Sequence, residues 1–170
     1  MRSLAVFVLI VTAALSQVTV APLFPMSAAI PDLGLVTLLL LAVFAGPKTV
    51  MVAMPMYAIF LGFASERSPG LLVLAYLPLL PLAYLLEEAS LPLSRLFRLL
   101  VVGGATGVWI RGIMAMSSVA QGAEFAVGDL IGSLLVPGLF LDLALLTIAY
   151  LPFRLIGLTS RGMTLQRGGY

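Results

Sequence analysis

Long apolar stretches, interrupted by Pro, Gly and charged residues, dominate the pattern of this chain. An apolar run of about 20 residues can cross a bilayer as a helix, and Pro and Gly mark where such helices end. The interruptions delimit six apolar segments, at residues 3–21, 33–45, 49–64, 71–86, 95–116 and 129–153. The pattern therefore predicts an all-α integral membrane protein, a compact bundle of six transmembrane helices. We expect the first segment to be a retained span rather than a cleaved signal peptide.

Three of these segments, 33–45, 49–64 and 71–86, are shorter than a typical span. Two of them contain prolines, Pro55 in one and Pro78 with Pro81 in the other. A proline inside a helix removes a backbone hydrogen bond and frees a carbonyl group. We therefore expect these helices to be kinked and packed against neighbours.

Composition agrees with a membrane protein, because 62% of the 170 residues are hydrophobic and only 9% are charged. The chain has no Cys and no His. This excludes disulfides, thiolate or imidazole metal ligands, and imidazole general bases. No phosphate-binding glycine motif opens a helix either, so the sequence predicts neither catalysis nor a metal or cofactor.

The basic residues favour one orientation of the bundle. Six spans place both termini and two of the loops on the same side, and this side receives seven of the nine basic residues: Arg2, Lys48, Arg95, Arg98, Arg154, Arg161 and Arg167. Basic residues concentrate on the cytoplasmic side of membrane proteins. We expect residues 1–153 to form the membrane domain and residues 154–170 a cytoplasmic tail.

Two charged residues, Arg111 and Asp142, fall inside predicted spans. Counted from Arg98 and Arg154 at the cytoplasmic boundary, they lie about 20 Å and about 18 Å into the membrane. An isolated charge at that depth is costly. We expect an Arg111–Asp142 ion pair that fixes one helix on the other, with Asp129 as second choice of partner. The alternative roles are contact with a substrate or partner and a proton or ion pathway, although a pathway usually has more carboxylates in the membrane.

Small residues accompany this pair. Gly103 and Gly107 precede Arg111 at intervals of four, and Gly138 precedes Asp142 by four. Small residues at this spacing allow close approach of helices in membranes. Nearer the cytoplasmic boundary, Glu87 and Glu88 are predicted to face Arg95 and Arg98. These four residues would form a charge cluster or a docking surface.

Several short motifs resemble the family of the rod shape-determining protein MreD. They are Gln17-x-Thr19-x-x-Pro22-x-Phe24, Pro31-Asp32-Leu33, Leu61-Gly62-Phe63 and Tyr150-Leu151-Pro152-Phe153-Arg154. In this resemblance Gln17, Pro22, Pro31, Asp32 and Gly62 belong to the family motifs and the outer loop. Chain length, six spans and cytoplasmic termini agree with the family.

The resemblance implies a non-catalytic scaffold of the machinery for cell elongation and lateral peptidoglycan synthesis, in the bacterial inner membrane. The implied partners are MreC, and through it the RodA glycosyltransferase, an elongation penicillin-binding protein and MreB. The alternative is the substrate-binding component of an energy-coupling-factor vitamin transporter. Its pocket would need polar groups from the outer half: Gln17, Asp32, Arg111, Ser117, Ser118, Gln121 and Glu124.

Overall fold

The fold is a bundle of helices in a computed structural model that describes residues 2–26, 29–87, 94–122, 128 and 130–155. The helices are α1 (Arg2–Thr19), the short 3-10 turn η1 (Ala21–Leu23), α2 (Leu33–Ala45), α3 (Pro47–Ser65), α4 (Pro69–Tyr76), α5 (Leu79–Glu87), α6 (Arg95–Ala120), the π-helix η2 (Leu130–Leu135) and α8 (Val136–Leu155). The predicted all-helical class is confirmed for the described residues, whose only bridge joins Met26 and Ala29.

Within the described residues, five helical stretches are long and apolar enough to cross a membrane: Ser3–Leu23, Pro47–Ser65, Pro69–Glu87, Arg95–Ala120 and Ile131–Pro152. The remaining predicted span, residues 33–45, is α2, whose 13 residues make a helix about 20 Å long. The apolar core of a bilayer is about 30 Å thick, so α2 alone cannot cross it. The side of the membrane on which the termini lie remains a prediction, as does the count of six spans.

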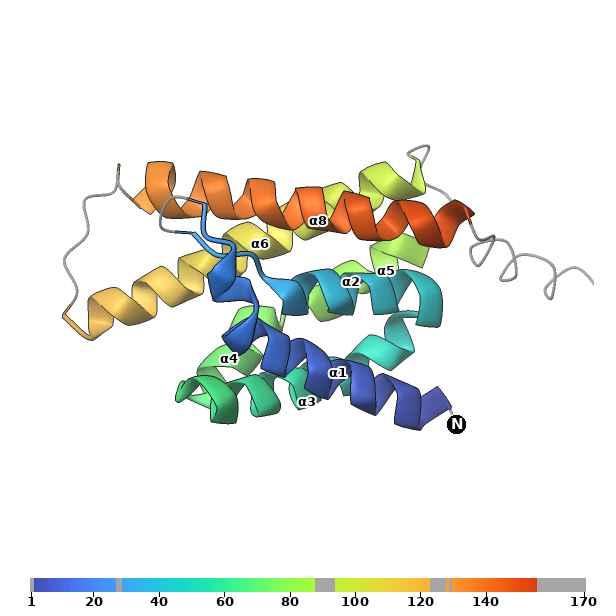
Figure 1. Cartoon of the computed structure of the whole chain (residues 1–170), viewed down its shortest axis with the longest axis horizontal. Helices are drawn as coiled ribbons and strands as arrows, with labels where there is room; N and C mark the ends of the chain where they lie inside the picture. The colour runs from blue at the N-terminus through green and yellow to red at the C-terminus, as the bar shows by residue number, and fades with distance from the viewer. Residues whose placement is uncertain (1, 27–28, 88–93, 123–127, 129, 156–170) are drawn as a thin grey trace, which may run out of the picture.

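The short helix α2 lies at the centre of the bundle (Figure 1), where it contacts α1, α3, α5, α6 and α8. Its side chains at Leu35, Leu38, Leu39 and Ala42 are fully buried. A helix that is apolar on all sides is stable where protein surrounds it completely. The surrounding helices therefore bury most of α2.

The helix ends follow local sequence signals. Gly46 ends α2 with a φ of 89°, a backbone conformation that favours glycine, and Pro47 begins α3 directly afterwards. The predicted kink at Pro78 is present as a break, since α4 ends at Tyr76 and α5 begins at Leu79. By contrast, α3 continues through Pro55.

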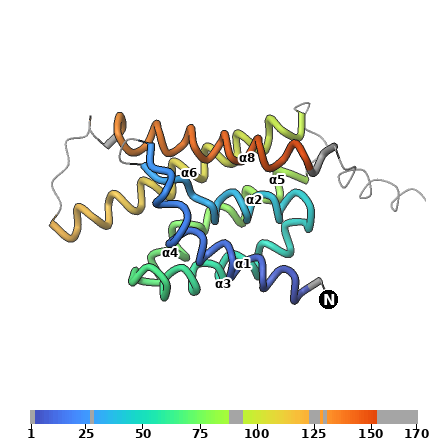
Figure 2. Tube along the Cα trace, viewed as in Figure 1, coloured from blue at the N-terminus to red at the C-terminus, as the bar shows by residue number. Residues whose placement is uncertain are grey.

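The chain ends of the described part lie together. The tube in Figure 2 places the N-terminus and the C-terminal end of α8 at one end of the bundle. The turn between α3 and α4 and the C-terminal end of α6 lie at the other end. We call this second end the distal end.

Close packing of α2 on α3 depends on Gly34. A Cβ atom at this position would overlap the ring and hydroxyl group of Tyr57, which is itself fully buried. Gly34→Ala should therefore lower the free energy of unfolding by about 1–3 kcal/mol, the usual cost of overpacking a core. The midpoint of thermal unfolding in detergent measures this change.

Gly104→Ala is the matched control, because a Cβ there meets nothing within 4 Å and alanine favours the helix. Its midpoint should stay constant or rise. Equal midpoints for the two variants would show that Tyr57 does not lie against Gly34.

Candidate functional site

The candidate site begins at the N-terminus of α2, where Asp32 is the capping residue. Its carboxylate accepts a hydrogen bond from the Leu35 amide at 2.9 Å. The Tyr76 hydroxyl of α4 lies 2.8 and 2.7 Å from the two carboxylate oxygens. First-turn amides lack intrahelical partners, and the helix dipole favours a negative charge at this end. Asp32 therefore allows α2 to begin within the bundle without leaving its first amides unbonded.

Asp142 on α8 joins this capped end to the predicted arginine. Its Oδ1 accepts a hydrogen bond from the Asp32 amide at 2.7 Å, and its Oδ2 pairs with Arg111 Nη1 on α6 at 2.7 Å. The structure thus brings Arg111 and Asp142 together. Asp142 is only 2% exposed, and a buried carboxylate is stable only when it is paired and hydrogen-bonded. Asp129, the second choice of partner, lies outside the described residues.

Gln17 connects α1 to the same point. Its Nε2 donates to the carbonyl of Pro31 at 3.0 Å, and its Oε1 accepts the amide of Leu33 at 2.7 Å. A single side-chain amide thus satisfies one donor and one acceptor of the chain entering α2. We call the set Gln17, Asp32, Tyr76, Arg111 and Asp142 the α2 junction.

The three predicted packing glycines make room around the ion pair. A Cβ at Gly138 would overlap the guanidinium of Arg111, and one at Gly107 would lie 2.8 Å from Leu139 and 3.2 Å from Arg111. A Cβ at Gly103 would lie 3.1 Å from Leu146 of α8 and 3.2 Å from Leu39 of α2. The small residues therefore allow α6 and α8 to approach each other, as their spacing predicts.

The remaining predicted residues lie apart from the junction. Pro22 belongs to η1, and Gly62 in α3 packs against Pro69 of α4, where a Cβ would lie 2.8 Å from the proline ring. Pro22 thus lines the cavity described below, and Gly62 lies beside the turn between α3 and α4 at the distal end.

The predicted charge cluster lies at the opposite end of the helices. Arg95 donates to the carbonyl of Val43 at 3.1 Å and Arg98 to the carbonyl of Leu85 at 3.5 Å. Glu87 is exposed at the end of α5, and Glu88 lies outside the described residues. The two arginines thus bind carbonyl groups of α2 and α5.

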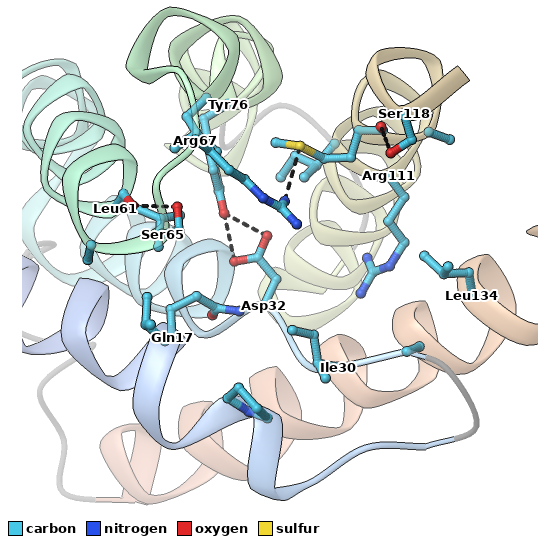
Figure 3. A pocket seen from close by; sticks show the side chains of 18 of the residues that line it. Gln17, Ile30, Asp32, Leu61, Ser65, Arg67, Tyr76, Arg111, Ser118 and Leu134 are labelled. Carbon is cyan, nitrogen blue, oxygen red and sulfur yellow. Dashed lines mark hydrogen bonds between the residues drawn. The ribbon is translucent and has the colours of Figure 1, made fainter. Parts of the chain in front are cut away.

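A cavity of about 640 Å³ opens beside the α2 junction (Figure 3). Asp32, Tyr76 and Arg111 contribute to its lining, together with Gln17 from α1 and Arg67 from the turn after α3. Ligand sites in proteins have volumes of about 300–1,000 Å³ and combine apolar walls with a few polar groups. Of the polar residues considered for a pocket, Ser118 also lines the cavity, whereas Glu124 lies outside the described residues.

Sequence reasoning missed three contributors. Tyr76 is one of several tyrosines in apolar segments, and its hydrogen bond to Asp32 depends on how the C-terminal end of α4 meets the start of α2 in space. Gly34 directly follows the Pro31-Asp32-Leu33 motif, but only the position of Tyr57 shows why it is small. Arg67 lies in a short polar stretch between two apolar segments, and nothing in that pattern indicates that it reaches across to α6.

The α2 junction is a structural network of hydrogen bonds. Its donors and acceptors bond mainly to one another, and no three metal-binding side chains (His, Cys, Asp or Glu) gather among the residues placed by the structure. Comparisons with protein-family models, with curated proteins and with solved structures find no match to this chain. Function is therefore inferred from the residues themselves.

The ion pair can be tested by removing one partner and then both. Asp142→Leu leaves Arg111 buried without its carboxylate and removes the acceptor of the Asp32 amide. It should lower the free energy of unfolding by about 3–5 kcal/mol, the usual cost of breaking a buried pair. Thermal or denaturant unfolding in detergent measures the loss.

The double variant Arg111→Leu/Asp142→Leu should recover part of this loss, because no uncompensated charge remains. Strictly additive effects of the two single variants, or an unchanged midpoint for Asp142→Leu, would contradict a coupled pair.

A second test concerns Tyr76. Tyr76→Phe removes the hydroxyl donor to the buried Asp32 carboxylate and should lower the free energy of unfolding by about 1–3 kcal/mol. Tyr84→Phe is the matched control, since that exposed hydroxyl donates only to the thioether of Met51 at 3.3 Å, a weak acceptor. A comparable loss in both variants would argue against a specific bond to Asp32.

Proposed function

We propose that this chain is a non-catalytic membrane scaffold of the machinery that elongates bacterial cells, the function implied by its resemblance to the MreD family. One observation carries the proposal. The motif residues Gln17, Pro31, Asp32 and Leu33 meet at a single hydrogen-bonded point at the centre of the bundle. The residues that produce the resemblance are therefore residues on which the packing of α1, α2 and α8 depends.

A scaffold needs a rigid body with faces that other helices can contact. The junction supplies the rigidity, because its buried polar groups are bonded to each other from α1, α2, α4, α6 and α8. Exposed apolar side chains cover the outer faces of α1, α6 and α8. In the proposal these faces lie in the lipid of the bacterial inner membrane.

We further propose that the single transmembrane helix of MreC lies on the outer face of α6. In lipid, helices associate through close packing at small residues, because burial of apolar surface gives no net gain. Gly104 and Gly112 lie on one face of α6 with exposed Val108 between them, and nothing lies within 4 Å of a Cβ at either glycine. RodA, the elongation penicillin-binding protein and MreB would join through MreC, with Arg95, Arg98 and Glu87 setting the orientation on the cytoplasmic side.

The first experiment is purification of the tagged chain from native membranes in mild detergent, followed by mass spectrometry of the proteins that accompany it. The proposal predicts MreC together with RodA or a penicillin-binding protein. Recovery of two ATPases and a coupling membrane subunit instead would contradict it and establish the transporter component.

The helix interface is tested in the same assay. The double variant Gly104→Ile/Gly112→Ile should remove MreC from the purified complex while leaving thermal stability unchanged, because both positions face outward. Ala5→Ile makes the same kind of change on the exposed face of α1 and should retain MreC. Retention of MreC in the glycine variant would rule out this face of α6.

The substrate-binding component of a vitamin transporter is a second candidate, and the cavity beside the α2 junction favours it. Such a component needs a pocket with converging polar groups, and Gln17, Asp32, Arg111 and Ser118 share this cavity. The co-purification described above distinguishes the two functions.

A further inference from the structure

The cavity at the distal end contains a charged group that the α2 junction does not use. Arg67, in the turn between α3 and α4, extends across the cavity toward α6 (Figure 3). Its Nη1 lies 3.5 Å from the thioether of Met114, which is a weak acceptor. Among the residues that the structure places, no carboxylate lies within 4 Å of Arg67.

Two of the other charged groups of the cavity, Arg111 and Asp32, are bonded within the α2 junction, and the third is the carboxylate of Glu66 beside Arg67. Arg111 gives Nη1 to Asp142, and Asp32 accepts from Leu35 and Tyr76. Arg67 makes no ion pair among the described residues, and its guanidinium has five N–H groups to donate. These donors form a planar fork that fits a carboxylate or phosphate with two parallel bonds.

The remaining lining is largely apolar. Leu61 and Leu72 lie on one side of the cavity, and Ile110, Met114 and Leu134 on the other. The Asp32 carboxylate at the floor repels a second anion, whereas Arg67 attracts one near the opening. A molecule bound here would place its charge against Arg67 and its apolar part between the walls.

We propose that this cavity binds an amphipathic molecule whose carboxylate or phosphate group is held by Arg67. The volume of about 640 Å³ accommodates a small molecule or the headgroup region of a lipid. The proposal rests on the cavity alone, so it holds or fails independently of the scaffold function and of MreC binding.

The absence of cysteine allows a direct test with a single introduced thiol. Ser118→Cys places the thiol in the cavity, and Thr19→Cys places one at the exposed end of α1, outside it. The rates of modification by anionic sulfonatoethyl and cationic trimethylammonioethyl methanethiosulfonate are measured on the full chain in phosphatidylcholine nanodiscs. The anion-to-cation rate ratio should be roughly fivefold higher at Ser118→Cys, as expected for one nearby positive charge in a hydrated site.

Charge variants identify the source of this preference. Adding Arg67→Gln should return the ratio at Ser118→Cys to that at Thr19→Cys, whereas Arg67→Lys should keep it raised. Glu66→Gln is the matched control: it removes a negative charge from the same lining and should not lower the ratio. Ser65→Cys, also in the cavity lining, replaces Ser118→Cys as reporter if that variant fails to fold. Equal ratios inside and outside the cavity, or a raised ratio that survives Arg67→Gln, would overturn the proposal.

Protection of the thiol distinguishes the two sources of the anionic group. Slower modification in phosphatidylglycerol than in phosphatidylcholine nanodiscs would assign a lipid headgroup. Slower modification on adding glycerol phosphate to phosphatidylcholine nanodiscs would assign a soluble phosphate compound, and added octanoate probes a carboxylate in the same way. In each case Arg67→Gln should abolish the protection. If none of the three probes protects the thiol, the proposal is wrong.

Discussion

The Asp142 carboxylate is the group on which the arrangement of the bundle depends. One oxygen accepts the backbone amide of Asp32 and the other accepts Arg111, both at 2.7 Å. An unpaired charge or a free backbone amide is costly away from water, so neither group can be left without a partner. This single side chain therefore fixes α8 against both α6 and the start of α2.

Helix α2 can begin inside the bundle only because the backbone groups at its N-terminus have hydrogen-bond partners. Asp32 caps the first turn, Tyr76 holds the capping carboxylate, and Gln17 bonds to the backbone on either side of it. The same arrangement explains the small residues nearby. Gly34 admits Tyr57, and Gly138 admits the Arg111 guanidinium, so a larger side chain at either position would displace a packed or paired group. The cavity then lies on the distal side of the junction, with Arg67 across it.

The helical class, the bounds of α2 and the convergence of Arg111 with Asp142 were predicted from the sequence. Each of them follows from residues close together in the chain or from a count of residues along it. Gly46 and Pro47 punctuate the chain, and depth along two antiparallel helices is a count of residues. Tyr76, Gly34 and Arg67 could not be found in this way. Their roles depend on which helices are neighbours, and periodicity indicates a buried face without naming the helix that covers it. The point within the bundle at which α2 begins could not be predicted either, because it depends on how the helices pack in three dimensions.

Residue-resolved amide hydrogen exchange in detergent tests the central claim most directly. First-turn amides of a helix normally exchange fast, because they have no partner within the helix. The amides of Asp32, Leu33 and Leu35 donate instead to side chains of the α2 junction, so they should be protected as strongly as amides in the middle of α2. The first turn of α4, whose capping residue Ser68 makes no side-chain bond, should exchange fast. Equally fast exchange at the two helix starts would contradict the account, because α2 would then have no hydrogen-bonded anchor in the bundle.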